Sequence, residues 1–249
     1  MTIKHPAFAD MAALRQLWQE AFGDSNAWLD SFFATAFSPD RCLTAWADGH
    51  LAAALYWLDC SCRGEKCAYL YAVATARSFR GHGICHSLMG QAHSLLRKQG
   101  YAMAVLVPGS ESLFRFYSSM DYEIFGGMQE LFHTATEASA PLRKVTATEY
   151  AQIRRSLLPD GGIVQEGPIL DFLQTQAAFY AGDGFVLCAQ KENGTLFVPE
   201  LLGHADPGAI LKALACREGT FRTPGDSPFA MWLPLKETQK PEYFAIALD

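Results

Sequence analysis

Apolar side chains recur at helical spacing in the first forty residues. Positions 11, 14, 17, 18 and 22 are apolar, which predicts an amphipathic helix between Asp10, a candidate N-cap, and Gly23. A second helix with an aromatic stripe begins near Ser25 and stops at Pro39. A short strand is expected at residues 2–5. These three elements precede the first long strands.

The apolar pattern then changes to that of β-strands. Residues 41–46 and 51–58 form two strand-like runs, and the Asp48-Gly49 pair between them is a strong hairpin signal. Residues 67–75 predict a third strand. Helical spacing returns at residues 84–96. The sequence thus predicts a three-stranded meander followed by an amphipathic helix.

Residues 101–133 complete one α+β unit. They predict a buried strand at 101–107, a short aromatic helix from Ser110 through Tyr117, and closing strands at 122–125 and 128–133. The expected fold is a mixed, mainly antiparallel sheet flanked by helices.

A change of composition predicts a domain boundary near residue 138. Residues 134–141 are small and polar, as in a linker, so we expect domains at residues 1–138 and 139–249. The second, smaller α/β domain repeats the order of elements: a strand at 142–145, helices at 147–158 and 172–179, a hairpin around Asn193-Gly194, a strand at 196–202, a helix at 208–216, and strands at 229–235 and 243–248. Either a divergent duplication or an unrelated α/β extension accounts for this order.

Composition narrows the class of protein. The formal net charge of −6 and the lack of a long basic run argue against binding to nucleic acid. The sequence has neither an apolar leader nor a long apolar stretch, so we expect a cytoplasmic protein without a membrane partner. The seven cysteines include no CxxC pair and are expected to be reduced. The oligomeric state stays open, a homodimer included.

The sharpest local signal lies where the third strand gives way to the long helix. Its residues are Arg80, Gly81, His82, Gly83, Ile84 and Cys85. Glycines let the backbone approach a ligand, and a helix N-terminus offers free N–H groups with partial positive charge. We interpret the segment as a cradle for a pyrophosphate, a group that CoA carries. A Rossmann loop would need a third glycine where His86 stands.

The segment resembles the acetyl-CoA motif of the GNAT family of N-acetyltransferases, R/Q-x-x-G-x-G/A. Arg80 and Gly83 match the motif, and Cys85 stands where Gly or Ala is usual. Residues 113–122 resemble the family's short helix, LYxxxGF, with Asp121 replacing the usual glycine. This resemblance implies a GNAT fold over the first half and a tandem GNAT protein with a degenerate second copy.

The resemblance also implies roles for individual residues. Val73, Ala74 and Thr75 resemble the family's splayed strand, in which the Val73 N–H would polarise the acetyl carbonyl and Thr75 would pair with the pantetheine amides. Together with residues 80–85 they would bind acetyl-CoA. Tyr117 is the candidate catalytic acid for the departing thiolate, although packing in an aromatic face explains it equally well.

The implied reaction is direct attack of a primary amine, on a small molecule or a peptide, on acetyl-CoA in a ternary complex. No general base stands out, since Tyr69 and Tyr71 occupy strand positions where relatives carry Glu. A catalytically silent acyl-CoA-binding module and a transferase of longer acyl groups are the alternatives.

Two further sequence features are weaker evidence for a binding site. His82 and His86 are four residues apart, but no third ligand lies in register, so we expect no metal site. In the second half, residues 203–208 occupy the place of the glycine loop, with Asp206 as a candidate N-cap and Pro207 in the first turn. A carboxylate in that place predicts a second domain without a CoA site.

Overall fold

The computed structural model describes residues 1–248 and divides into two compact units. The first unit comprises residues 1–106, 110–122 and 232–239, and the second is built around residues 123–231. The units therefore interleave along the chain. The expected domain boundary at residue 138 stays a prediction.

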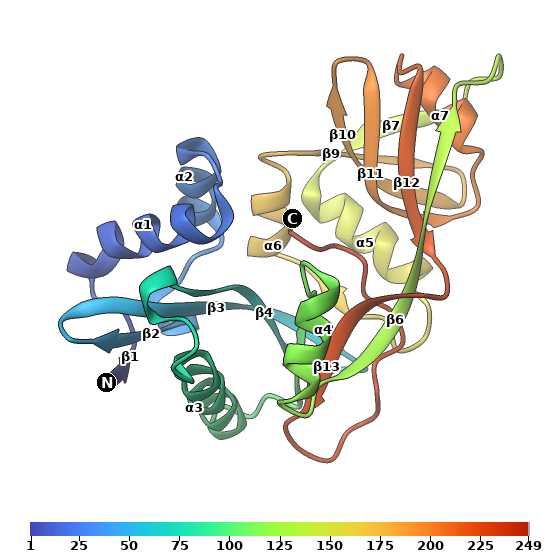
Figure 1. Ribbon diagram of the computed structural model, residues 1–249. Coiled ribbons are helices and arrows are strands. Elements are labelled where there is room, and N and C mark those ends of the chain that lie inside the picture. Colours follow the sequence, from blue (N-terminus) through green and yellow to red (C-terminus); the bar gives the residue numbers. More distant parts are fainter. Residues whose placement is uncertain (249) are drawn as a thin grey trace. The chain divides into compact units, whose positions relative to one another are not determined.

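The first unit contains a sheet with the order β1-β2-β3-β4-β5. Its elements are β1 (Thr2–Lys4), α1 (Met11–Phe22), α2 (Asn26–Thr35), β2 (Cys42–Ala47), β3 (His50–Cys62), β4 (Glu65–Thr75), α3 (Ile84–Lys98), β5 (Met103–Leu106) and α4 (Glu111–Ser118). Figure 1 shows α1 and α2 on one face of this sheet and α3 on the other.

Local chemistry explains several of these boundaries. Gly23 ends α1 in the left-handed region, at φ 77°, and the Ser25 side chain accepts a hydrogen bond from the Trp28 N–H to cap α2. Asp10 is the N-cap residue of α1, as expected, but its side chain makes no capping hydrogen bond to that helix. Its carboxylate accepts a hydrogen bond from the Ala7 N–H instead. The predicted helices and hairpin of this unit are confirmed.

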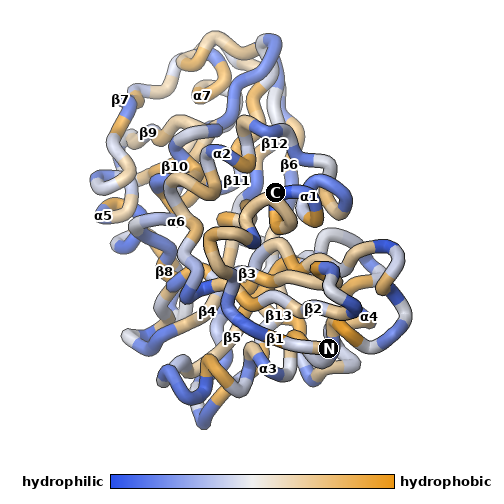
Figure 2. The backbone as a smooth tube through the Cα atoms, turned by 90° about the vertical axis from the view of Figure 1, so that its left-hand side faces the viewer, coloured by the Kyte–Doolittle hydropathy of each residue, from blue (hydrophilic) through white to orange (hydrophobic). Residues whose placement is uncertain are grey.

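The core of the first unit lies on both faces of its central strands. β3 is buried at seven consecutive positions, because α1 and α3 pack against it from opposite sides. Figure 2 shows apolar colouring along much of the strands, and hydrophilic colouring at loops and within helices such as α1 and α5. None of the helices within residues 1–248 is long and apolar enough to cross a membrane.

The second unit has the strand order β6-β12-β11-β10-β9-β7. Its elements are β6 (Glu123–Thr134), β7 (Leu142–Val145), α5 (Ala147–Leu157), β8 (Val164–Gln165), α6 (Pro168–Leu173), β9 (Ala178–Gly182), β10 (Phe185–Glu192), β11 (Thr195–Gly203), α7 (Pro207–Ala213) and β12 (Glu218–Pro224). The next strand, β13 (Ser227–Pro234), begins in the second unit and ends in the first.

The two units repeat one topology. In the first, antiparallel strands β1 to β4 are followed by α3 and by β5, which pairs parallel to β4. In the second, antiparallel strands β7, β9, β10 and β11 are followed by α7 and by β12, parallel to β11. The strand before each crossover helix carries one extra residue relative to its partner. This agreement confirms the mixed fold and the repeated order of elements in the second half, and it supports a duplication.

Three element predictions after residue 121 were wrong. The two predicted closing strands are one continuous strand, β6. Gly126 and Gly127 do not make a turn between them, but allow another segment of backbone to pack closely. A Cβ on Gly127 would lie 1.7 Å from the Gly225 carbonyl oxygen. Phe179 lies in β9 and not in a helix. Tyr243 forms an isolated bridge with Gly162 in place of a strand.

The segment expected to be a linker is anchored to the second unit. The Ala135 N–H donates to the Arg217 carbonyl at 2.8 Å, and the Ala140 N–H donates to the Ala209 carbonyl at 3.0 Å. Small polar residues are typical of linkers, but short side chains also let a backbone lie close to a helix. Here they cover the start of α7.

Candidate active site

One cavity of about 660 Å³ in the first unit brings together nearly all residues predicted for the site. Those lining it are Val73, Ala74, Thr75, Arg80, Gly81, Gly83, Ile84, Cys85 and Tyr117. His82 is exposed on the loop and is not among the lining residues. The cavity lies between the end of β4, the start of α3 and one face of α4.

The end of β4 is splayed away from β5. Parallel pairing of the two strands reaches Tyr69, opposite Val105, whereas β4 continues to Thr75. A bulge on β4 places Ala72 at a φ of 48°, a conformation uncommon for a residue with a Cβ. The main chain at Val73 is therefore turned out of the parallel ladder and lines the cavity.

The glycine loop connects β4 to α3. Gly81 and Gly83 have φ values of 79° and 74°, so a side chain at either position would be strained. Gly83 is the N-cap residue of α3 and has no side chain with which to cap it. The Arg80 Nε donates to the Thr75 carbonyl at 3.0 Å, which ties the loop to the strand end. The helix thus presents its N-terminal N–H groups to the cavity, as an anion requires.

Tyr117 brings a buried phenol to the cavity. Its side chain is 6% exposed, and its ring contacts those of Phe116 and Tyr122. Burial, with a smaller contribution from the nearby Cys85 thiol, raises the pKa of Tyr117. Among residues 1–248, its hydroxyl has no hydrogen-bond partner. A protonated phenol with a free O–H can donate to a group bound in the cavity.

Cys85 contributes a neutral thiol. Burial raises the pKa of Cys85 to about 11, and a side-chain hydrogen bond with Thr75 opposes this shift. At neutral pH the thiol is therefore protonated and weakly nucleophilic. Cys85, which stands where Gly or Ala is usual, therefore adds no charge to the cavity.

Several lining residues were missed from the sequence. Phe22 was assigned to the core stripe of α1, but its side chain is 47% exposed and lines the cavity. Phe79, Ser110 and Phe116 also line it. His86 lines it too, with its ring edge-on to that of Phe116 at 5.1 Å. A large apolar residue at the exposed end of a helix was the available signal for Phe22.

A buried pair behind the cavity was also missed. The His93 Nε2 of α3 and the Tyr122 hydroxyl oxygen are hydrogen-bonded at 2.8 Å. Burial, and then the charge of Arg97, lowers the pKa of His93 to about 4, so the imidazole is neutral. The two residues are 29 positions apart, and nothing in the local sequence pattern links them.

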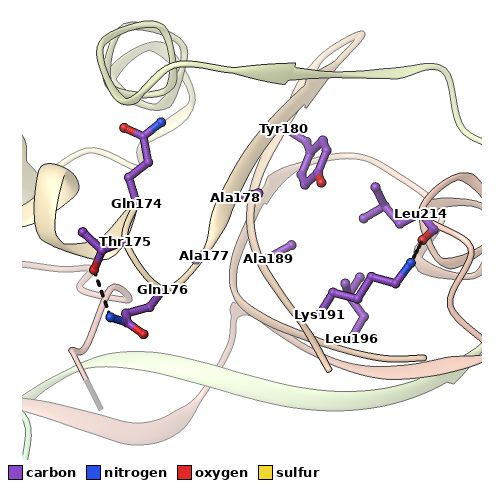
Figure 3. Close-up of a pocket in the computed structure, with 10 residues that line it drawn as sticks. All are labelled: Gln174, Thr175, Gln176, Ala177, Ala178, Tyr180, Ala189, Lys191, Leu196 and Leu214. Atoms are coloured by element: carbon purple, nitrogen blue, oxygen red, sulfur yellow. Dashed lines mark hydrogen bonds between the residues drawn. The ribbon is translucent and has the colours of Figure 1, made fainter. Parts of the chain in front are cut away.

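The second unit has a hollow of a different kind, shown in Figure 3. It measures about 370 Å³ and is lined by Gln174, Thr175, Gln176, Ala177, Ala178, Tyr180, Ala189, Lys191, Leu196 and Leu214. The Lys191 Nζ donates to the Leu214 carbonyl at 2.7 Å, just after α7. This ammonium group stabilises the C-terminal end of a helix, whereas the glycine loop of the first unit leaves the N-terminal end of a helix free to bind an anion.

The counterpart of the glycine loop in the second unit is closed. The Asp206 carboxylate accepts a hydrogen bond from the Gly208 N–H at 2.9 Å, and Pro207 supplies no N–H. Thr136 covers the same turn, since a Cβ on Gly208 would lie 2.5 Å from its methyl group. The helix end already has a carboxylate where an anion would bind.

The strand that corresponds to β4 also differs. In β11 the first paired residue after the bulge is Glu200, where β4 has Ala74. The Arg154 guanidinium contacts both Glu200 oxygens, at 2.7 and 2.9 Å, and the Tyr150 and Tyr243 hydroxyls donate to them at 2.6 and 3.1 Å. Arg154 and Glu200 are 1% and 0% exposed, so this ion pair fills the interior of the second unit.

Comparison with known proteins identifies a protein family whose domain matches the first half of the chain. The model of the acetyltransferase (GNAT) domain matches residues 2–125. No curated protein sequence matches the chain.

Solved structures share the fold over nearly the whole chain. A GCN5-related N-acetyltransferase from Anabaena variabilis is 14% identical, with a TM-score of 0.73 over 94% of this chain and 73% of the other. One from Kribbella flavida is 14% identical, with a TM-score of 0.70 over 93% and 70%. A tandem GNAT protein from the clavulanic acid biosynthesis pathway is 12% identical, with a TM-score of 0.57 over 96% and 100%. At these identities the likeness is one of fold.

Proposed function

This chain belongs to the GNAT acetyltransferase family, and we propose that the cavity of its first unit transfers an acetyl group from acetyl-CoA to a primary amine. Members of the family use acetyl-CoA as the donor. The observation that carries the proposal is the meeting, in one cavity, of an uncapped helix N-terminus, a splayed strand end and an unpartnered tyrosine hydroxyl.

The donor would lie along β4 and reach the glycine loop. The N–H groups at the start of α3, from Gly81 to Cys85, would bind the pyrophosphate, and Arg80 would add a full positive charge. Val73, Ala74 and Thr75 would run alongside pantetheine, where the Val73 N–H would polarise the acetyl carbonyl.

The chemistry is a direct transfer in a ternary complex. The amine nitrogen forms a bond to the carbonyl carbon, the C–S bond breaks, and the departing thiolate takes the proton of Tyr117. The raised pKa of Tyr117 makes the phenol a weaker acid, but the same burial disfavours a free thiolate. None of the described residues lining the cavity carries a carboxylate, and we propose that water accepts the amine proton.

The second unit would hold no CoA. The Asp206 cap and the buried Arg154–Glu200 pair occupy the positions that correspond to the proposed donor-binding loop and strand end of the first unit.

The test is release of the CoA thiol from acetyl-CoA with polyamines, aminoglycosides, amino acids and peptides. We expect turnover with at least one amine, and a loss of about 100-fold in kcat for Tyr117→Phe. Tyr180→Phe, which removes a phenol of the second unit, is the matched control. Affinity for acetyl-CoA should stay within about threefold in both variants.

Other outcomes separate the alternatives. Acetyl-CoA binding without thiol release on any amine would favour the silent acyl-CoA module. Faster turnover with a longer acyl-CoA would favour the broader transferase. Full activity of Tyr117→Phe would remove Tyr117 from the mechanism.

A further inference from the structure

The helix that carries Tyr117 is too short to be stable by itself. α4 has eight residues, and Ser110 at its N-cap makes no side-chain capping hydrogen bond. Isolated helices of this length are marginal in water, because nucleation costs more than a few hydrogen bonds return. The position of the Tyr117 hydroxyl therefore depends on contacts that α4 makes with other elements.

The turn after α4 brings Tyr122 back against Tyr117. The N–H groups of Met120 and Tyr122 both donate to the Tyr117 carbonyl, at 2.9 and 3.2 Å. Asp121 sits at a φ of 65° in this turn, a strained conformation for a residue with a Cβ. The rings of Tyr117 and Tyr122 meet edge to face, with centroids 5.8 Å apart. Main chain and ring of Tyr117 are thus both held by Tyr122.

Tyr122 is in turn fixed to the helix of the glycine loop. Its hydroxyl is hydrogen-bonded to His93 Nε2 at 2.8 Å, and both side chains are buried, at 2% and 7% exposed. His93 lies on α3, whose first residues, Ile84 and Cys85, line the cavity. One helix therefore carries the loop at its start and the anchor of Tyr122 further along.

We propose that His93 and Tyr122 are positioning residues that hold the Tyr117 hydroxyl at a fixed place relative to the glycine loop. The proposal rests on the role of Tyr117 in the proposed function. A proton donor is effective when its reach to the accepting atom is set by rigid neighbours, and a shift of about 1 Å can cost about 100-fold in rate. The His93–Tyr122 hydrogen bond and the ring contact between Tyr122 and Tyr117 together link α3 to Tyr117.

The first experiment follows Tyr117 directly and needs no acceptor. Full-length protein is labelled with 3-fluorotyrosine at its nine tyrosines, and the ¹⁹F resonance lost in Tyr117→Phe is assigned to Tyr117. We expect Tyr122→Phe and His93→Leu to shift and broaden this resonance. His93→Gln, whose amide can still bond the Tyr122 oxygen, should change it less. Tyr243→Phe, which removes a buried hydroxyl of the second unit, should leave it unchanged.

The second experiment is a double-mutant cycle on kcat. Tyr122→Phe is expected to lower kcat by about 10-fold or more while the acetyl-CoA Kd stays within about threefold. In the Tyr117→Phe background, Tyr122→Phe should change kcat by less than about twofold, because the positioned hydroxyl is gone. A merely structural role would lower stability without this dependence on Tyr117.

The outcomes distinguish the two claims. An unchanged Tyr117 resonance in both Tyr122→Phe and His93→Leu overturns the positioning role, as does an equal loss of kcat with and without the Tyr117 hydroxyl. If Tyr117→Phe keeps full activity while the resonance shifts, the positioning role stands and the catalytic role of Tyr117 fails.

Discussion

At the scale of single residues, the buried His93 links stability to pH. Its pKa is lowered to about 4 in the folded protein, first by burial and then by Arg97, against an ordinary value of 6.5. Between these two values the unfolded chain binds a proton that the folded chain does not. The contribution of the neutral His93 to stability is therefore fully present above about pH 6.5, and it is lost as the pH falls towards 4.

We predict that His93 accounts for up to about 3 kcal/mol of acid destabilisation between about pH 7 and pH 4. The measurement is urea unfolding at several pH values for wild type and His93→Gln. Carboxylates contribute to the pH dependence of stability in both proteins. The difference between the two slopes of unfolding free energy against pH therefore isolates the contribution of His93. Parallel slopes would contradict a neutral buried imidazole.

The sequence was sufficient to predict those parts of the candidate site that are local. The loop at residues 80–85 combines special backbone, charge and a helix start within six positions, and these signals do not depend on distant packing. His93, Tyr122 and the arginine–glutamate pair of the second unit could not be found in this way, because their partners lie 29 and 46 residues away. The unpartnered state of the Tyr117 hydroxyl likewise required the fold.

At the scale of elements, the end of β13 completes the first unit. The Leu235 N–H donates to the Ala102 carbonyl at 2.8 Å, and the Arg97 Nε donates to the Leu235 carbonyl at 3.1 Å. Lys236 pairs with Glu65 at 2.9 Å. A strand from the far end of the chain thus lies beside β5.

This interleaving predicts that residues 1–138 do not fold as an independent domain. Without residues 232–239 the fragment loses the buried side chains of Trp232, Leu233 and Leu235, each 6–7% exposed. Burial of three such side chains contributes at most about 5–9 kcal/mol, comparable to the total stability of a domain.

We expect the fragment to show no cooperative thermal transition by circular dichroism, whereas the full chain shows one. A fragment that melts cooperatively and binds acetyl-CoA with full affinity would support the boundary at residue 138. Periodicity identified most elements here, but it carries no information on which strands pair across 130 residues.

At the scale of the whole molecule, the two units share a topology and differ at the equivalent site. In the second unit the interior contains the Arg154–Glu200 pair with its tyrosine donors, which leaves both carboxylate oxygens satisfied. Such a pair is costly to break, because removal of one charge leaves the other buried without a partner.

We predict that Glu200→Gln lowers the free energy of unfolding by about 3–5 kcal/mol. The acetyl-CoA Kd should be unchanged at temperatures where the variant is folded. Glu192→Gln, an exposed carboxylate of β10, is the control and should have little effect on stability. A stable Glu200→Gln would show that the ion pair is dispensable, and weaker acetyl-CoA binding would give the second unit a part in the donor site.

The central claim is that each chain has one donor site, at the glycine loop of the first unit. Native mass spectrometry with acetyl-CoA tests it on wild type, Gly83→Asp and Gly100→Asp. Both glycines have positive φ, 74° and 81°, and open space around the missing Cβ, so the two substitutions impose a similar strain at opposite ends of α3. We predict one acetyl-CoA per chain in wild type and Gly100→Asp, and none in Gly83→Asp. Two molecules per wild-type chain, or one retained by Gly83→Asp, would contradict the assignment.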